Sequence, residues 1–314
     1  MASLKEIKAR IGSVGSTLKI TSAMKMVASA KLRKAQNAIG NMLPYQEGLQ
    51  GILRDLLAKE GGDLSSYAPV APEAPEEAFG GRLEEKAAPG VALVCFSSNS
   101  SLCGAFNANA IREATAAIRE HEARGEKVTV YSVGRKMAEA MRKAGYPSPE
   151  DFTRLSAHPE YAAAAALGQE LMDGFASGRF SKVELIYNHF KSTASQPTVR
   201  ETYLPMTQTC PAGQRPSDAE GDVFPSVSDE GPDYIVEPDL RTQVMLLLPK
   251  VMLLKIYTVL LDAAAAEHAA RTVAMQTATD NGNELLRQLT LEYNKSRQAK
   301  ITAEILDLEG GALE

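Results

Sequence analysis

Apolar residues near the start of the chain recur at intervals of three and four residues, which is the spacing of a coiled-coil seam. The first seam positions are Leu4, Ile7, Ile11, Val14 and Leu18. After a slip near residues 20–24 the stripe resumes, and the helical pattern runs to about Ala58. Such a helix has some 55 residues and a length of about 80 Å. Because this exceeds the size of one globular domain, the helix needs a partner along its length.

The end of the chain predicts a second long helix, from Asp239 to about Glu309. At some 70 residues it would be roughly 105 Å long, interrupted by Pro249 and Gly282, with a kink expected near Leu246. Neither long helix is stable alone in water, so we expect an antiparallel two-helix coiled coil. In that pairing residue i faces roughly residue 297 − i. About 15 to 20 residues at the end of the chain then project beyond the first helix as a single helix.

The middle of the chain alternates between strand-like and helical patterns. Strands are expected at 91–96, 127–133, 182–190 and 199–206, and helices at 105–123, 136–144 and 161–176. This alternation favours a small parallel sheet. The predicted fold class is therefore α/β, with a long antiparallel coiled coil of N- and C-terminal helices and a central Rossmann-like domain. The expected segments are a helix (1–59), a Pro-rich loop (60–88), the α/β domain (89–209), an acidic Pro-rich loop (210–238) and the final helix (239–314).

Composition narrows the class of protein. The chain has 314 residues, 34 basic against 39 acidic side chains and a net charge of −5, which excludes a polybasic nucleic-acid coat protein. Its three cysteines form no CxxC pair, so neither a disulfide framework nor a zinc ribbon is encoded. The first residues lack the apolar core of a secretory signal, and no uninterrupted apolar run is long enough to span a membrane. Any membrane association is expected to be indirect.

Motifs for catalysis or cofactor binding are missing from the sequence. There is no P-loop, no GxGxxG and no GxSxG, and the turn after the first strand, SSNSSLCGAFN, lacks the glycines that a pyrophosphate needs. The four histidines are scattered without the spacing of a metal site. We therefore expect no catalytic residue, no cofactor and no metal.

The first 40 residues are strongly basic within this acidic protein. Only Glu6 opposes the eight basic residues Lys5, Lys8, Arg10, Lys19, Lys25, Lys31, Arg33 and Lys34. Such a run is compatible with a solvated helix face or with a face that slides over acidic loops of a surrounding protein. The pattern alone leaves both interpretations open.

Two stretches carry a resemblance to a known family. KEIKARIGSVGSTLKITSAMKMVASAKLRKAQ (5–36) and ATDNGNELLRQLTLEYNKSRQAKITAEILDLEGGA (278–312) resemble the opening and closing helices of the gamma subunit of F-type ATP synthase. The order helix, α/β unit, helix agrees with that family across the chain. In the central loop the chain departs from it, because Asn99, Ser100 and Ser101 stand where the family usually has Asp, a basic residue and Gly before Leu-Cys-Gly. The Pro-rich loops also look longer than is typical.

The resemblance implies a noncatalytic central shaft that couples ion flow through the c-ring to ATP synthesis or hydrolysis by rotation. The implied partners are a ring of three alpha and three beta subunits, the epsilon subunit and the membrane c-ring, without nucleic acid and without direct membrane insertion. The implied location is peripheral, on the cytoplasmic face of the inner membrane. By motif match, Met24 and Lys25 would face the moving acidic loop of the beta subunit. Contacts with the sleeve of the ring would come from Arg297, Gln298, Thr302 and Glu304.

Two other functions stay open on the residues alone. One is a non-rotary coiled-coil adaptor, whose basic first helix binds an acidic protein or a nucleic acid. The other is a Rossmann-like enzyme with helical extensions, which would bind a nucleotide through residues 89–208.

Overall fold

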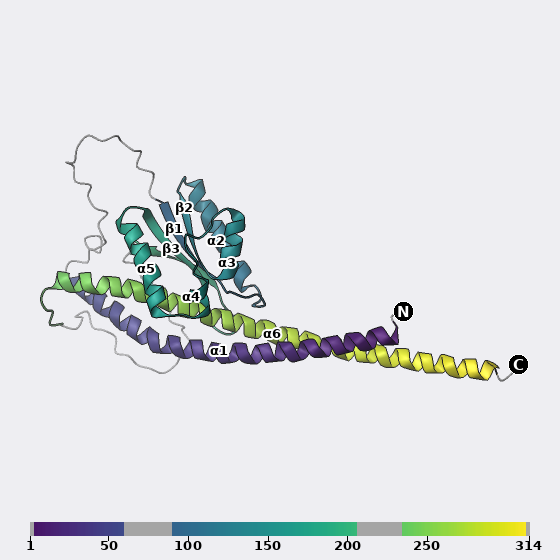
Figure 1. Ribbon diagram of the computed structural model, residues 1–314. Helices are drawn as coiled ribbons and strands as arrows, with labels where there is room; N and C mark the ends of the chain where they lie inside the picture. The colour runs from purple at the N-terminus through teal and green to yellow at the C-terminus, as the bar shows by residue number, and fades with distance from the viewer. Residues whose placement is uncertain (1–2, 60–89, 206–233, 312–314) are drawn as a thin grey trace.

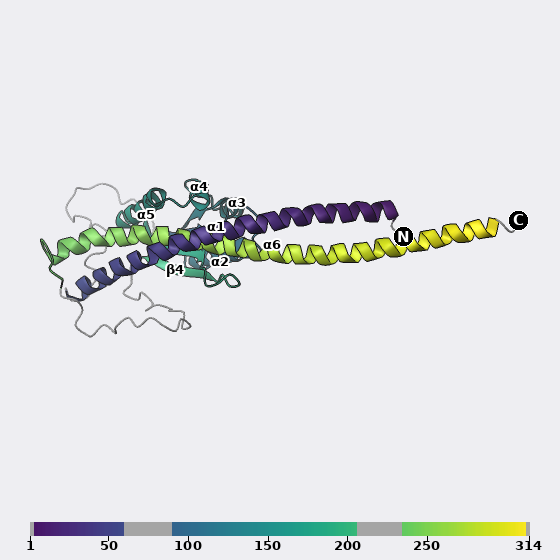
Figure 2. The ribbon, with the colours of Figure 1, turned by 90° about the horizontal axis from the view of Figure 1, so that it is seen from below.

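The computed structural model describes residues 3–59, 90–205 and 234–311, so the segment 60–88 and most of 210–238 lie outside the described residues. Two long helices dominate the molecule: α1 (Leu4–Lys59) and α6 (Leu240–Gly311). They run antiparallel and side by side, with a compact α/β domain seated on α6 near one end (Figure 1). Seen from below, α1 crosses α6 under the α/β domain, as expected for helices that wind about each other (Figure 2).

The register of the coiled coil is fixed by contacts across the seam. The Thr279 hydroxyl lies 3.1 Å from the Thr21 hydroxyl, and Gly282 lies against Leu18, whose Cδ2 would be 2.6 Å from an added Cβ. In this region residue i therefore faces about residue 300 − i. The expected register of 297 − i was wrong by three residues, less than one helical turn, because its reference points were the imprecise helix ends next to the loops.

Small side chains let the two helices approach closely in the middle of the coil. There Leu32 of α1 packs against Ala265 and Ala269 of α6, and both alanines are fully buried. Near the end of α1 and the start of α6 the seam is built of larger residues. There Leu53 and Leu56 pack on Val244 and Val251. The coil thus changes in thickness along its length, which makes it an uneven rod.

The α/β domain contains four strands and four helices among the described residues. The strands are β1 (Gly90–Phe96), β2 (Val128–Val133), β3 (Phe180–Asn188) and β4 (Thr198–Leu204), and the helices are α2 (Phe106–Ala123), α3 (Arg135–Ala144), α4 (Thr153–Ala157) and α5 (Tyr161–Ala176). The strand order is β2-β1-β3-β4. β1 pairs in parallel with β2 and β3, whereas β4 is antiparallel to β3. The parallel pairing of the first strands agrees with the sequence analysis, which left the direction of the strand expected at 199–206 open. The nine-residue link between β3 and β4 is too short for a crossover and closes a hairpin instead.

Helices cover both faces of the sheet. One face packs against α2 and α3, through residues such as Ala114 and Met137. The other packs against α5 and α6, through residues such as Leu171 and Ile256. The central strand β1 is buried along its whole length as a result. Helix α6 therefore belongs both to the coiled coil, as one of its two helices, and to the α/β domain, as part of the layer that covers one face of the sheet.

Helix α6 is also long and apolar enough, by length and composition, to cross a membrane. Its apolar window has a mean hydropathy of 2.0, and half of that window is buried against the rest of the chain. The core helix of a water-soluble domain has the same properties, so this window by itself is weak evidence for a span.

Candidate functional site

The candidate site is the part of the coiled coil that projects beyond the α/β domain. In both ribbon views α1 and α6 leave the domain together, and α6 continues past the first residues of α1 (Figures 1 and 2). With the observed register, Leu4 lies opposite about residue 296, so α6 is a single helix from there to Gly311. This overhang is about 20 Å long.

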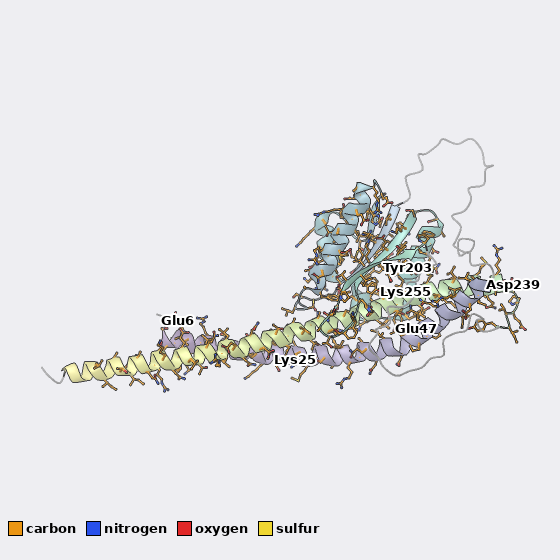
Figure 3. All side chains as sticks on the ribbon, turned by 180° about the vertical axis from the view of Figure 1, so that it is seen from behind. Glu6, Lys25, Glu47, Tyr203, Asp239 and Lys255 are labelled. Carbon is orange, nitrogen blue, oxygen red and sulfur yellow. The ribbon has the colours of Figure 1, made fainter. Side chains whose placement is uncertain are left out.

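Met24 and Lys25 lie where the coil leaves the α/β domain, with Lys25 labelled in Figure 3. Both side chains are half-buried. Their neighbours Met26 and Val27 are 65% and 57% exposed. This level of the shaft thus combines one cationic side chain with apolar surface that nothing in the described part of the chain covers. The sequence analysis missed Met26 and Val27, although they lie just off the apolar stripe.

The other four predicted site residues all lie on the exposed overhang of α6. The Thr302 hydroxyl donates to the Gln298 carbonyl oxygen at 2.9 Å. Glu304 lies 3.6 Å from the Lys300 ammonium, so its neighbour is Lys300 rather than Arg297. Both members of this pair are about two-thirds exposed, so the pair contributes little to stability.

Apolar side chains share the overhang with these polar groups. Ile301, Ile305 and Leu306 are 46%, 51% and 61% exposed. An isolated helix end with this much exposed apolar surface indicates a surface that another protein covers. The sequence analysis did not single out these three residues, although the run ITAEIL carries the signal.

The two groups of predicted residues form separate levels rather than one site. The register places Lys25 opposite residue 275, and 22 residues of α6 separate that level from Arg297. The corresponding distance along the shaft is about 33 Å. Contacts with a surrounding protein would therefore occur at two heights.

The basic face of α1 forms no close ion pair with the described part of the chain. Seven of its eight lysines and arginines are exposed, and Lys25 is half-buried. Among residues 3–59, 90–205 and 234–311 none of the eight has a carboxylate within 4.0 Å. A row of unpaired cations of this kind attracts an acidic partner.

Several polar contacts join the α/β domain to α6. Asp262 accepts hydrogen bonds from the Phe190 N–H at 3.0 Å and from the His189 ring at 2.6 Å. That hydrogen bond raises the pKa of His189. Lys255 lies 3.1 Å from Glu201, and the buried Tyr203 hydroxyl donates to the Met252 carbonyl at 3.0 Å (Figure 3). These contacts hold the β3–β4 hairpin on the shaft.

A buried charge network holds the domain together internally. Glu184 of β3 is 2% exposed, and its carboxylate accepts from Arg200 and Lys182, each at 2.6 Å. Burial acts to raise the pKa of Glu184, but these cations outweigh burial and lower it to about 2. His121 lies beside them, 2.5 Å from Glu126 and 3.0 Å from the Arg200 guanidinium. Nε2 of the same ring also lies 3.2 Å from the Glu184 carboxylate, so this nitrogen faces both a hydrogen-bond acceptor and a donor.

The turn at the end of β1, where a Rossmann-like enzyme would bind a nucleotide, is held by side-chain hydrogen bonds. The side chain of Asn107 and the hydroxyl of Ser98 fill the turn that follows the strand. On the other side Cys103 and Phe106 pack directly against Ala266 of α6. Within the described residues no cluster of three His, Cys, Asp or Glu side chains is placed to hold a metal ion.

Comparison with known proteins identifies the family. The ATP synthase family profile matches residues 3–313. The chain is 50% identical to the ATP synthase gamma chain of Phocaeicola vulgatus, over 100% of both chains. It is 45% identical to that of Bacteroides thetaiotaomicron, again over 100% of both, and 39% identical to that of Flavobacterium johnsoniae, over 99% and 98%.

Solved structures have the same fold. A chain of the Euglena gracilis mitochondrial ATP synthase, in an assembly titled OSCP/F1/c-ring, is 20% identical with a TM-score of 0.57, over 98% of this chain and 92% of that one. A chain of the Tetrahymena thermophila enzyme, titled central stalk/c-ring, is 21% identical with a TM-score of 0.52, over 82% and 99%. Full-length relatives, shared fold and projecting coil together place this chain in the ATP synthase gamma-chain family, the noncatalytic central-stalk subunits of that rotary enzyme.

Proposed function

We propose that this chain is the shaft of an F1Fo ATP synthase and turns inside a ring of three alpha and three beta subunits. In this proposal its base and α/β domain are held by the epsilon subunit and the membrane c-ring. The complex lies on the cytoplasmic face of the inner membrane, and the chain itself is peripheral. The division into segments 1–59, 60–88, 89–209, 210–238 and 239–314 is part of this proposal, with the two terminal helices as the shaft.

The observation that carries the proposal is the uneven, projecting coil. A three-fold ring contains identical catalytic sites, and only an asymmetric axle presents a different face to each one. To move one site from 1:99 to 99:1 between two conformations, the shaft must supply about 5.5 kcal/mol of differential contact energy. The cations of α1 and the exposed apolar residues at two levels are the groups that would supply this energy.

Site roles follow from the two levels. Met24 and Lys25, at the lower level, would meet the acidic moving loop of the beta subunit. At the upper level Arg297, Gln298, Thr302 and Glu304 would contact the sleeve formed by the top of the ring. The separation of about 33 Å means that one level can drive the catalytic sites while the other keeps the axle centred.

Co-purification from membranes tests the proposal. The full chain, tagged at a terminus and expressed in its native host, is expected to bring down two larger nucleotide-binding proteins in equal numbers together with c-ring protein. The complex should hydrolyse ATP, and the purified chain alone should not. A tagged copy shortened to end before Ala278 serves as control, because it lacks the upper shaft and should recover less of the ring. Recovery of other partners without these chains would contradict the proposal and favour the adaptor.

A further inference from the structure

The loop that follows β1, residues 97–105, carries an exposed apolar side chain in an uncommon backbone conformation. Leu102 has a φ of +67° and is 57% exposed. For a non-glycine residue the left-handed region is unfavourable, because the Cβ atom comes too close to the following carbonyl oxygen. A leucine persists in that conformation on the surface only where the surrounding contacts hold it there.

The root of the loop is held by α2. The Asn107 side chain accepts from the Ser98 N–H at 3.0 Å and donates to the Ser98 hydroxyl oxygen at 2.8 Å. The Ser98 hydroxyl in turn donates to the Ser100 carbonyl at 2.5 Å. This network fixes the turn up to Ser100.

A second tie holds the loop to its neighbours in the α/β domain. The Asn99 amide donates to the Thr153 carbonyl at 2.7 Å, and its oxygen accepts from the Arg135 N–H at 2.8 Å. Both this tie and the Asn107 network stay within the α/β domain. They orient the loop on the sheet but do not connect it to the shaft.

Arg271 makes that connection. Its guanidinium donates to the Ser100 hydroxyl at 2.8 Å and lies 2.5 Å from the Glu267 carboxylate. The side chains of Arg271 and Glu267 are each 11% exposed, so the pair is largely withdrawn from water. Burial raises the pKa of Glu267, and Arg271 opposes that rise by favouring the charged form. The planar guanidinium of arginine can donate to two groups at once. The bond to Glu267 therefore fixes the orientation of the guanidinium that donates to Ser100.

Packing around this link brings the loop and α6 together as one surface. Cys103 and Phe106 pack on Ala266, and a Cβ at Gly104 would lie 4.0 Å from that of Ala274. Val273 of α6, 40% exposed, lies in the same stretch of helix. Leu102 therefore projects beside the shaft at the height where the coil leaves the domain.

We propose that Arg271 is a positioning residue, which locks loop 97–105 onto α6 so that Leu102 is carried by the shaft as a fixed apolar projection. That the shaft turns rests on the proposed function, whereas the lock itself is a property of the isolated chain. The lock makes the loop part of the axle rather than a movable arm of the α/β domain.

Hydrogen exchange of the full chain tests the lock. Ser100→Ala removes the acceptor of Arg271 while leaving Glu267 paired, and it should speed exchange of the backbone amides at 100–103 roughly fivefold to tenfold. Ser100→Lys places a like charge beside Arg271 and should have a larger effect. The matched control is Ser101→Ala, which removes an exposed neighbouring hydroxyl with no part in these contacts and should leave the rates unchanged.

A double variant shows whether Arg271 acts through Ser100. Glu267→Gln with Arg271→Ala removes both charges, so that no buried charge is left unpaired. If the lock is real, adding Ser100→Ala to this pair changes the exchange rates no further. Unchanged exchange at 100–103 in Ser100→Ala, or fully additive effects, would overturn the lock. Neither result affects co-purification with the ring, which tests the proposed function. The two proposals can therefore fail independently of each other.

Discussion

The hydroxyl groups of Thr21 and Thr279 lie 3.1 Å apart across the coiled coil, although 258 residues separate them in the sequence. The Thr279 side chain also bonds to the Met275 carbonyl in its own helix at 2.8 Å. The Thr21 hydroxyl bonds in the same way to the Leu18 carbonyl oxygen at 3.1 Å, so in a neighbouring register each hydroxyl keeps the bond within its own helix. Only the contact across the seam depends on the register. It therefore selects the alignment of α1 and α6.

A double-mutant cycle should detect this pair. Thr21→Val and Thr279→Val are each expected to destabilise the chain, with a coupling energy of about 0.5–1 kcal/mol between them. Urea unfolding of the two single variants and the double variant measures it. Thr290→Val is the control, since that hydroxyl bonds only to Leu286 in its own helix. Full additivity of the two seam variants would argue against a register-selecting bond.

Gly134 should be the glycine least tolerant of substitution. Its φ is +109°, and an added Cβ would lie 2.2 Å from the Ser97 carbonyl oxygen, which is backbone and cannot rotate away. Gly134→Ala is therefore expected to cost more than about 3 kcal/mol or to prevent folding. Gly145 provides the control, because its φ is +94° but nothing lies within 4 Å. Gly145→Ala should cost only about 1–2 kcal/mol. Similar unfolding midpoints for the two variants would contradict this account.

His268 should make the coil sensitive to acid. Burial lowers its pKa to about 4, and the nearby cations Arg271 and Lys31 act in the same direction. In the unfolded chain the pKa is near 6.5, so between pH 6.5 and 4 the unfolded state binds more protons than the folded state. Stability should therefore fall as the pH is lowered through this window. His268→Leu should flatten that part of the curve of unfolding free energy against pH; an unchanged slope would exclude His268 as its source.

His189 should have the opposite pH dependence. Its hydrogen bond to Asp262 raises its pKa above the unfolded value, so the stabilisation is fully present below pH 6.5 and is lost as the pH rises through the folded pKa. His189→Gln keeps a donor but removes the titration. It should abolish the loss of stability above neutral pH, and NMR titration of the ring should give a pKa above 6.5 in the parent chain. A ring pKa at or below 6.5 would contradict the Asp262 pairing.

Charge reversals at the two levels of the shaft should separate coupling from assembly. Lys25→Glu and Glu304→Lys are expected to lower ATP-driven ion pumping relative to ATP hydrolysis, because each reverses the charge that a proposed contact presents to its partner. Both activities are measured on the same membrane vesicles. Glu150→Lys is the control, a charge reversal at an exposed position of the α/β domain that has no part in the proposed contacts. Normal pumping and assembly in Glu304→Lys would refute the proposed role of that residue.

Long-range periodicity explains why much of the fold could be predicted. The seam from Leu4 onward spans many turns, so the helix end expected near Ala58 lies one residue from the observed end at Lys59. The direction of β4 could not be predicted, because its residues suit either orientation and only the short hairpin decides it. The five-residue helix α4 is too short to leave a periodic signal.

Contacts between distant segments limited the prediction of the site. Six residues were predicted by motif match, and the structure places them at two exposed or half-exposed levels of one shaft. The link between Arg271 and Ser100 joins residues 171 positions apart, and no local pattern marks either one. Exposed apolar residues such as Met26 could be recognised only once the register showed which face of α1 points away from α6.

Helix α6 belongs both to the coiled coil and to the α/β domain, and this affects the state of the nascent chain during synthesis on the ribosome. Translation reaches Leu240 about 180 residues after α1 is finished, a delay of roughly 10 to 40 s at bacterial speeds. Throughout that time α6 is absent. The apolar stripe of α1 is therefore uncovered, and one face of the sheet lacks a helix that packs on it. The strong positive charge of α1 opposes aggregation of the nascent chain during this time, so the lysines proposed to face an acidic partner also have a role before assembly.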